Sequence, residues 1–256
     1  MNVNQFYARL SERIPPSLSC AWDHDGLMVC PEGRRSVTRV LCTLDVTDEA
    51  VSYAIANRFD VILSHHPLIF HPIGALTPAD HVARKCMRLL SAGIAVMSFH
   101  TRADAVNDGV NDRLCDLLGL SDAQPLGDGE DGRIGRIASL DAPLSCADFA
   151  ARVKEALDLP ALLLSDAERP VRQVAVCGGE GKDMIPLALA AGADTLLAGR
   201  IGYHPMTDAP EIGLNMLEAG HYYTETHITA FFAELTEEII PDVYVEEFAS
   251  DVIICV

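Results

Sequence analysis

The chain has 256 residues, of which 49% are hydrophobic, and its formal net charge at pH 7 is −18. This length allows one large domain or two small ones, and the apolar content is sufficient for a globular core. The negative charge argues against a broad nucleic-acid-binding surface, but it is compatible with a local basic pocket for phosphate.

Signals for export and for membrane insertion are absent from the sequence. No apolar run approaches the roughly 18–20 residues that span a bilayer, and the N-terminus has no basic segment followed by an apolar one. The eight cysteines include no CxxC pair, which indicates reduced thiols and argues against a cysteine zinc site. We therefore expect a cytoplasmic protein with no membrane partner.

The first hundred residues alternate between helix and strand patterns. Apolar residues at helical spacing mark the helices, and short continuous apolar runs mark buried strands. We expect helices over 3–14, from Thr47 or Asp48 onward and over 81–92, and strands over 37–44, 61–63 and 94–99. The first two strands belong to a βαβ unit and should be parallel. A turn over 22–27 should be anchored by burial of Trp22.

The rest of the chain is expected to contain a small module and a second βαβ region. A helix over 107–118 precedes a polar stretch, in which 127–132 is interpreted as an exposed linker. The later expected elements are strands over 134–140, 162–164, 171–177, 195–198, 214–217, 244–248 and 252–256, with helices over 146–157, 182–191 and 226–239. The predicted class is α/β, with a first half over 1–125, an inserted module over 126–170 and a second half over 171–256.

The stretch from Asp60 to Pro67 carries the strongest functional signal. Its apolar strand ends in two adjacent histidines, His65 and His66, and ligand sites in open α/β sheets lie beyond the carboxyl ends of strands. Adjacent residues of a strand point to opposite faces, so the pair suits two neighbouring metals better than one. The alternative is that one histidine is a buried hydrogen-bonding residue and the other is exposed.

A weak internal repeat predicts which other residues join this pair. Residues 40–67 and 174–205 both run strand, turn, helix, strand, His-Pro, and each is followed by a His-x-x-x-acid motif. If the two half-units face each other, five side chains converge: His65, His66, Asp104, His221 and Glu225. This set suits Zn, Fe, Mn or Co and does not suit Ca. Five ligands fit two metals about 3.5–4 Å apart.

Other polar residues remain open to more than one interpretation. His100 could hydrogen-bond to a metal ligand, bind metal itself or be a hydrogen-bonded core histidine. His204 could hydrogen-bond to a metal ligand, bind metal itself or contact the substrate. The turn over 178–181 could cradle a phosphate, but it lacks a P-loop and is interpreted first as a tight turn. The remaining histidines are expected to be structural or solvent-facing: His24, His71, His81 and His227.

Several motifs together resemble the NIF-three-like proteins, often labelled GTP cyclohydrolase I type 2 homologues. The resemblance runs over nearly the whole chain. The motifs are Trp22-Asp-His-Asp-Gly-Leu27, Thr43-Leu-Asp45, Ser64-His-His-Pro-Leu-Ile-Phe70, His100-Thr-Arg-Ala-Asp104, Cys177-Gly-Gly, Tyr203-His204 and Gly220-His-Tyr-Tyr-Thr-Glu225. The resemblance implies two interlocked α/β domains, a di-metal centre with Glu225 as the bridge, and a toroidal homohexamer.

The chain departs from the family pattern around these motifs. Arg102 and Ala103 replace the usual Asn-Leu, and Arg200 and Gly202 replace an acid and a lysine. If the two arginines face the cleft, they favour a small anionic substrate, such as a nucleotide, through bidentate contacts.

Two functions follow from these residues. The first is a hydrolase with two divalent metal ions per subunit, with His204 or His100 as proton shuttle and, by the family label, GTP ring opening with formate release as the reaction. The second is a metal carrier or regulatory protein without turnover. Metal-dependent turnover of GTP distinguishes the two.

Overall fold

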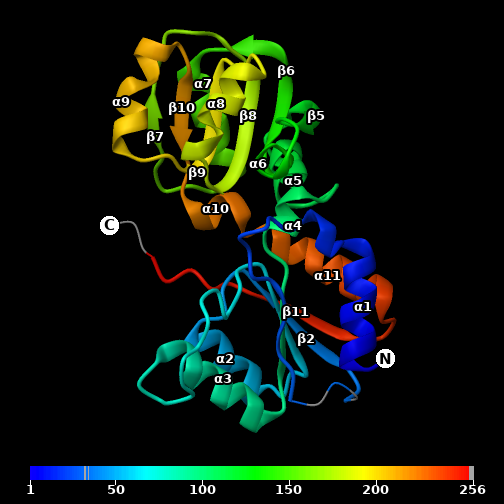
Figure 1. The fold of residues 1–256 in the computed structure, drawn as a ribbon. Coiled ribbons are helices and arrows are strands. Elements are labelled where there is room, and N and C mark those ends of the chain that lie inside the picture. Colours follow the sequence, from blue (N-terminus) through cyan, green and yellow to red (C-terminus); the bar gives the residue numbers. More distant parts are fainter. Residues whose placement is uncertain (32, 34, 254–256) are drawn as a thin grey trace. The chain divides into compact units, whose positions relative to one another are not determined.

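The computed structural model describes residues 1–31, 33 and 35–253 and divides the chain into two compact units (Figure 1). Unit 1 comprises Met1–Ala103 and Ile228–Val252, and unit 2 is built on Asp104–His227. Each unit contains a β-sheet flanked by helices, so the predicted α/β class is confirmed. Among the described residues, no helix combines the length and apolarity needed to cross a bilayer.

Unit 1 contains a five-stranded sheet in the order β1-β4-β3-β2-β11. The strands are β1 (Gly26–Val29), β2 (Arg39–Thr43), β3 (Val61–Ser64), β4 (Ala95–Ser98) and β11 (Tyr244–Phe248). All neighbours pair in parallel except β1, which is antiparallel to β4. The predicted parallel pairing of the strands around 37–44 and 61–63 is therefore confirmed.

Helices cover both faces of this sheet (Figure 1). They are α1 (Val3–Arg13), α2 (Asp48–Ala56), α3 (His81–Ala92) and α11 (Ile228–Ile239), and a 3-10 turn covers Pro16–Leu18. Apolar residues of α2 and α3 pack on those of β2, β3 and β4 in one core. The Thr47 side chain caps α2 by accepting from the Ala50 amide, and Gly93 ends α3 in the left-handed conformation.

Unit 2 contains a six-stranded sheet in the order β5-β6-β8-β9-β10-β7, in which only β8, β9 and β10 pair in parallel. The strands are β5 (Ser121–Pro125), β6 (Arg136–Leu144), β7 (Leu163–Ser165), β8 (Val171–Glu180), β9 (Thr195–Arg200) and β10 (Asn215–Glu218). The helices are α4 (Thr101–Ala105), which spans the unit boundary, α5 (Val110–Leu117), α6 (Glu130–Ile134), α7 (Cys146–Ala156), α8 (Ile185–Ala190), α9 (Tyr203–Ile212) and α10 (His221–Glu225), with a 3-10 turn at Lys182–Met184.

Several predicted boundaries differ from the structure. The predicted linker over 127–132 is exposed at 128–131, as expected, but its last three residues begin α6, and it joins the paired strands β5 and β6. Residues 126–170 supply β6 and β7 to the same sheet as β8–β10, while α11 and β11 belong to unit 1. The predicted three-part division therefore does not coincide with the compact units.

Three local predictions were wrong or extend past the described part. Trp22 is 52% exposed, so it does not anchor its turn by burial; its ring meets Phe70 and His100 edge-on. A helix forms over 203–212 where none was predicted, because prolines at 205 and 210 mask its pattern. The predicted final strand includes Val252 and Ile253, which are not in a strand, and three residues outside the described part.

Close packing of β8 and β9 makes Gly199 a sensitive position. A Cβ there would lie 2.6 Å from both the Gly179 carbonyl oxygen and Thr224 Oγ1. We expect Gly199→Ala to lower the free energy of unfolding by about 1–3 kcal/mol, because backbone atoms cannot move aside cheaply. Denaturant unfolding measures the loss, and Gly74→Ala is the control, since no atom lies within 4 Å of a Cβ built there. Equal stabilities of the two variants would contradict the expectation.

Candidate metal centre

His65 and His66 directly follow β3, where the sheet still holds their backbone. Their amide groups donate to the carbonyls of Thr43 and Leu44 at 3.2 and 3.0 Å. Ser64 Oγ also donates to the His66 carbonyl at 3.0 Å. His65 is fully buried and His66 is partly exposed. The strand end therefore fixes the backbone from which both imidazoles project.

Each histidine of unit 1's candidate site is held through the same ring nitrogen. In all three, Nδ1 lies within hydrogen-bond distance of a backbone or carboxylate oxygen, so Nε2 is the nitrogen that can bind a metal. The three pairs are His65 with the Phe99 carbonyl at 3.0 Å, His66 with Asp45 Oδ1 at 2.8 Å and His100 with Asp23 Oδ1 at 2.9 Å. Anchoring of this kind is typical of metal-binding histidines.

The three imidazoles form one cluster within unit 1. A ring nitrogen of each lies within 4.8 Å of one on each of the others. Ring centroids are 5.0 Å apart for His65 and His66, 5.2 Å for His65 and His100, and 5.7 Å for His66 and His100. His100 thus lies where a further ligand would lie, which sequence reasoning had left open.

The turn before β1 supports the His100 end of this cluster. Asp23 Oδ2 accepts from the amide and hydroxyl of Thr101 at 3.0 and 2.6 Å, and Asp25 Oδ2 accepts from the His100 amide at 3.2 Å. Burial opposes ionisation of Asp23, but the bonds from His100 and Thr101 outweigh it and lower the pKa of this carboxyl. Sequence reasoning missed these roles, although Asp23, Asp25 and Asp45 all belong to the motifs quoted above.

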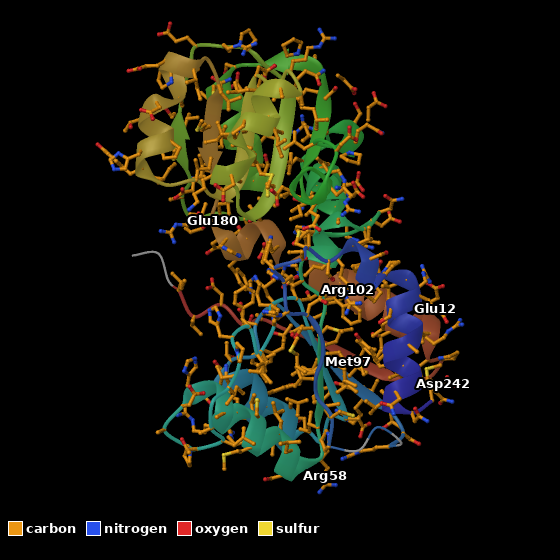
Figure 2. All side chains as sticks on the ribbon, viewed as in Figure 1. Glu12, Arg58, Met97, Arg102, Glu180 and Asp242 are labelled. Atoms are coloured by element: carbon orange, nitrogen blue, oxygen red, sulfur yellow. The ribbon has the colours of Figure 1, made fainter. Side chains whose placement is uncertain are left out.

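Asp45 gives the first test of this arrangement. We expect Asp45→Asn to weaken binding of Zn²⁺ or Co²⁺ by about ten- to a hundredfold, because the neutral amide orients His66 less well and makes it a poorer donor. Competition with a chelating dye measures the affinity. Glu12→Gln, a change at an exposed acid on α1 (Figure 2), controls for the change in net charge. Equal affinities in the two variants would contradict a role for Asp45.

Unit 2 carries a second set of donors. His221 and Glu225 lie one turn apart on α10, with His221 Nε2 3.0 Å from Glu225 Oε2. Asp104 lies on α4, and a carboxylate oxygen of it lies within 4.8 Å of one of Glu225. Both acids are at least nine-tenths buried. Two carboxylates this close repel each other when ionised, and a bound cation relieves that repulsion.

Glycines of β8 allow α10 to approach the sheet. A Cβ on Gly179, whose φ is +67°, would lie 2.3 Å from Glu225 Oε1 and 3.1 Å from His221 Nε2. The strand continues through Glu180, so the predicted tight turn over 178–181 is instead the end of a strand. Because Gly179 has no side chain, the metal-ligating groups of His221 and Glu225 can lie close to this strand.

The pKa of the Cys177 thiol is affected by the same carboxylates. Burial raises the pKa of its thiol, and the charges of Asp104 and Glu225 raise it further. Without a bound cation the thiol therefore stays protonated near neutral pH, and Cys177 belongs to none of the close donor groups among the described residues.

The remaining predicted residues fall in different places. His204 is exposed in the first turn of α9 and belongs to none of the close donor groups among the described residues. Arg200 is exposed at the end of β9. Arg102 does not meet the condition under which it would favour an anionic substrate, because it is buried and its Nε donates to Asp25 Oδ2 at 3.0 Å. Of the histidines set aside, His24, His71 and His81 are exposed, and His227 Nε2 lies 2.8 Å from the Val110 carbonyl.

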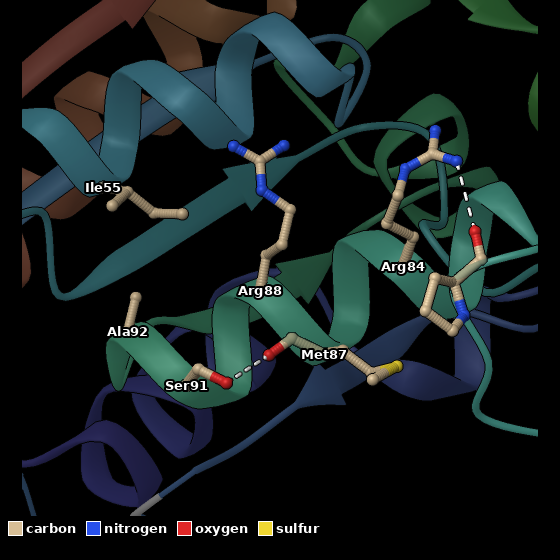
Figure 3. A pocket seen from close by; sticks show the side chains of 7 residues that line it. Ile55, Arg84, Met87, Arg88, Ser91 and Ala92 are labelled. Carbon is tan, nitrogen blue, oxygen red and sulfur yellow. Dashed lines mark hydrogen bonds between the residues drawn. The ribbon is translucent and has the colours of Figure 1, made fainter.

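A pocket of about 570 Å³ on unit 1 lies between α2 and α3 and contains none of these donors (Figure 3). Its two arginines are already engaged: Asp48 accepts from Arg84 and Arg88 at 2.8 and 3.2 Å, and Ser52 Oγ accepts from Arg88 at 2.8 Å. We therefore do not assign it to the metal chemistry.

Comparison with known proteins gives a consistent family. The family model described as Duf34/NIF3 (NGG1p interacting factor 3) matches residues 1–253. A Clostridium perfringens GTP cyclohydrolase 1 type 2 homolog is 30% identical over 244 residues, covering 93% of this chain and 92% of the relative. A Lactococcus lactis protein of the same name is 34% identical over 233 residues, covering 89% of each chain. The crystal structure of a Bacillus cereus protein related to NIF3 has a TM-score of 0.90 at 22% identity, covering 100% of this chain and 99% of that one.

Imidazoles and carboxylates gathered as they are in each unit could hold metal ions. With matches over nearly its full length, the chain belongs to the Duf34/NIF3 family.

Proposed function

We propose that this protein is a metal-dependent hydrolase whose two donor sets together hold two divalent cations. The residues that would hold these cations are His65, His66, Asp104, His221 and Glu225, with His100 as a further ligand, and Glu225 would be shared by both cations. The observation that carries the proposal is the anchoring of all three unit 1 imidazoles through Nδ1. Neither set is sufficient alone, because unit 1 offers imidazoles and unit 2 supplies the carboxylates that neutralise charge.

The reaction that fits this centre is opening of a GTP ring with release of formate, as the names of the relatives suggest. Bound divalent cations would supply Lewis acidity and lower the pKa of water at the site. The chain's own exposed groups then act on substrate. Arg200 at the end of β9 binds phosphate oxygens, and His204 carries protons to and from the substrate. We further propose that the protein acts as a homohexamer, which light scattering of the purified chain would test.

Turnover decides the proposal. The protein is loaded with Zn²⁺, Mn²⁺, Fe²⁺ or Co²⁺ and incubated with GTP and a panel of phosphate esters, and formate and phosphate are measured. Metal-dependent formate release is expected, with a loss of at least about a hundredfold in Glu225→Gln, since a bridging carboxylate holds both cations. Glu211→Gln, at an exposed acid on α9, is the control. No turnover with any metal, combined with rapid transfer of metal to an apo acceptor, would contradict the hydrolase and favour a metal carrier.

A further inference from the structure

A second pocket lies in unit 2. It has a volume of about 430 Å³ and is lined by residues of β7, β10 and α9, including Leu163, Tyr203, Met206 and Glu218. Glu218 is the last residue of β10, and α9 begins three residues after β9 ends. The pocket therefore lies at the carboxyl ends of two parallel strands, where open α/β sheets bind ligands. Its volume falls within the range of small-molecule sites.

Large apolar side chains around this pocket are exposed. Leu163 is 59% exposed, Leu164 39% and Tyr203 77%. Both leucines belong to β7, which is the edge strand of the sheet, and Tyr203 opens α9. Single exposed apolar residues need no explanation, but a group gathered at a pocket is typical of a binding site.

One fixed carboxylate accompanies these apolar groups. Glu218 Oε2 accepts from the amides of Ile201 and Gly202 at 2.6 and 2.8 Å. Both of these bonds are to the same carboxylate oxygen of the Glu218 side chain. Two backbone donors hold the carboxylate in place, and Glu218 is one of the residues that line the pocket, so its Oε1 can accept hydrogen bonds from a ligand. A ligand with N–H donors along one edge would satisfy it.

We propose that this pocket binds the 2-amino-4-oxopyrimidine edge shared by guanine nucleotides and pterins. The ring stacks on Tyr203 against the apolar wall, and Glu218 accepts from the ring N–H and the amino group. Adenine fits less well, because its ring nitrogen presents a lone pair to the carboxylate on that edge. The assignment rests on the proposed function and gives it a substrate subsite.

The position of the pocket connects the ring with the metal donors of unit 2. Glu218 precedes His221 by three residues, so their Cα atoms are at most about 11 Å apart. His204 follows Tyr203 directly, and the two rings contact edge-on with centroids 5.4 Å apart. A ring held by Tyr203 and Glu218 would therefore lie close to the proposed proton carrier and within reach of the α10 donors.

Nucleotide binding without metal tests the assignment separately from turnover. The full chain is kept in EDTA, and GTP, XTP, ATP and neopterin are titrated by calorimetry. GTP is expected to bind more tightly than ATP. Glu218→Gln should weaken GTP by about ten- to a hundredfold, because its amide oxygen takes the two backbone donors and turns an N–H₂ group toward the ring. The same variant should raise the affinity for XTP relative to that for GTP, since xanthine carries an oxygen where guanine carries the amino group. Glu211→Gln should leave both affinities unchanged.

A pair of variants at the exposed Tyr203 keeps the test independent of folding. Tyr203→Phe should retain GTP binding, and Tyr203→Leu should lose about tenfold or more, because stacking needs an aromatic ring. If neopterin binds as tightly as GTP, the ring edge that the two share is sufficient for binding. If neopterin binds more weakly than GTP, the ligand is a nucleotide.

Three outcomes would overturn the assignment. They are equal affinity of the wild type for GTP and ATP, no GTP binding at all, or Glu218→Gln and Tyr203→Leu variants that change the oligomeric mass and leave GTP binding intact. A failure of metal-dependent turnover with these binding results unchanged would remove the hydrolase and leave the pocket assignment standing.

Discussion

Replacing His66 with alanine is expected to weaken binding of Zn²⁺ or Co²⁺ by at least about a hundredfold. His66 projects from a strand end, and its Nδ1 lies 2.8 Å from Asp45 Oδ1, which orients Nε2 for metal binding. The alanine variant removes this oriented ligand and leaves Asp45 without the imidazole that it holds. Loss of a residue that only hydrogen-bonds to a metal ligand typically costs ten- to a hundredfold in affinity. Loss of the ligand itself should exceed that.

Cobalt makes this experiment independent of activity. Bound Co²⁺ absorbs in the visible, and its spectrum changes with the number and type of ligands. The His66→Ala spectrum should lose intensity or vanish at metal concentrations that saturate the wild type. His81→Ala removes an exposed histidine from the first turn of α3 and should change neither spectrum nor affinity. A His66 variant that binds cobalt with the wild-type spectrum would remove unit 1 from the metal centre.

The candidate ligands could be predicted because their signal is local. His65 and His66 stand at the end of a four-residue buried strand, and strand ends are where open α/β sheets place their chemistry. The anchors of these histidines could not be predicted in the same way. Asp23 lies 77 residues before His100, and Asp45 lies 21 residues before His66. Such pairs form only when the sheet brings β1 next to β4 and β2 next to β3.

The fold shows the same limit. Strongly periodic segments such as α3 and buried runs such as β3 appear in the structure where they were expected. Two segments escaped prediction because their composition opposed their final state. The polar stretch before β6 is held by pairing of β5 with β6, and α9 forms although Pro210 lies inside it. Tertiary contacts outweighed local propensity in both.

Arg102 is the clearest case of a residue whose type suggested the wrong role. Its charge would have favoured an anionic substrate if it faced a cleft, but the side chain is fully buried in unit 1. Nε donates to Asp25 at 3.0 Å, Nη1 donates to the Ile14 carbonyl at 3.2 Å, and the guanidinium stacks 4.1 Å from the centre of the Phe99 ring. These contacts make Arg102 the internal partner of the Asp25 carboxylate, which in turn accepts from the His100 amide at 3.2 Å.

Arg102→Leu is accordingly expected to lower the free energy of unfolding by about 3–5 kcal/mol, because it leaves the 7%-exposed side chain of Asp25 charged without its cation. Arg9→Leu, at an exposed ion pair on α1, should change stability by less than about 0.5 kcal/mol. The double variant Asp25→Asn/Arg102→Leu should lose less stability than the sum of its single variants, since neither charge then remains unpaired. Denaturant unfolding measures all four proteins. If Arg102 instead bound substrate, Arg102→Leu would leave unfolding unchanged and raise KM for an anionic substrate, which would contradict the structural role.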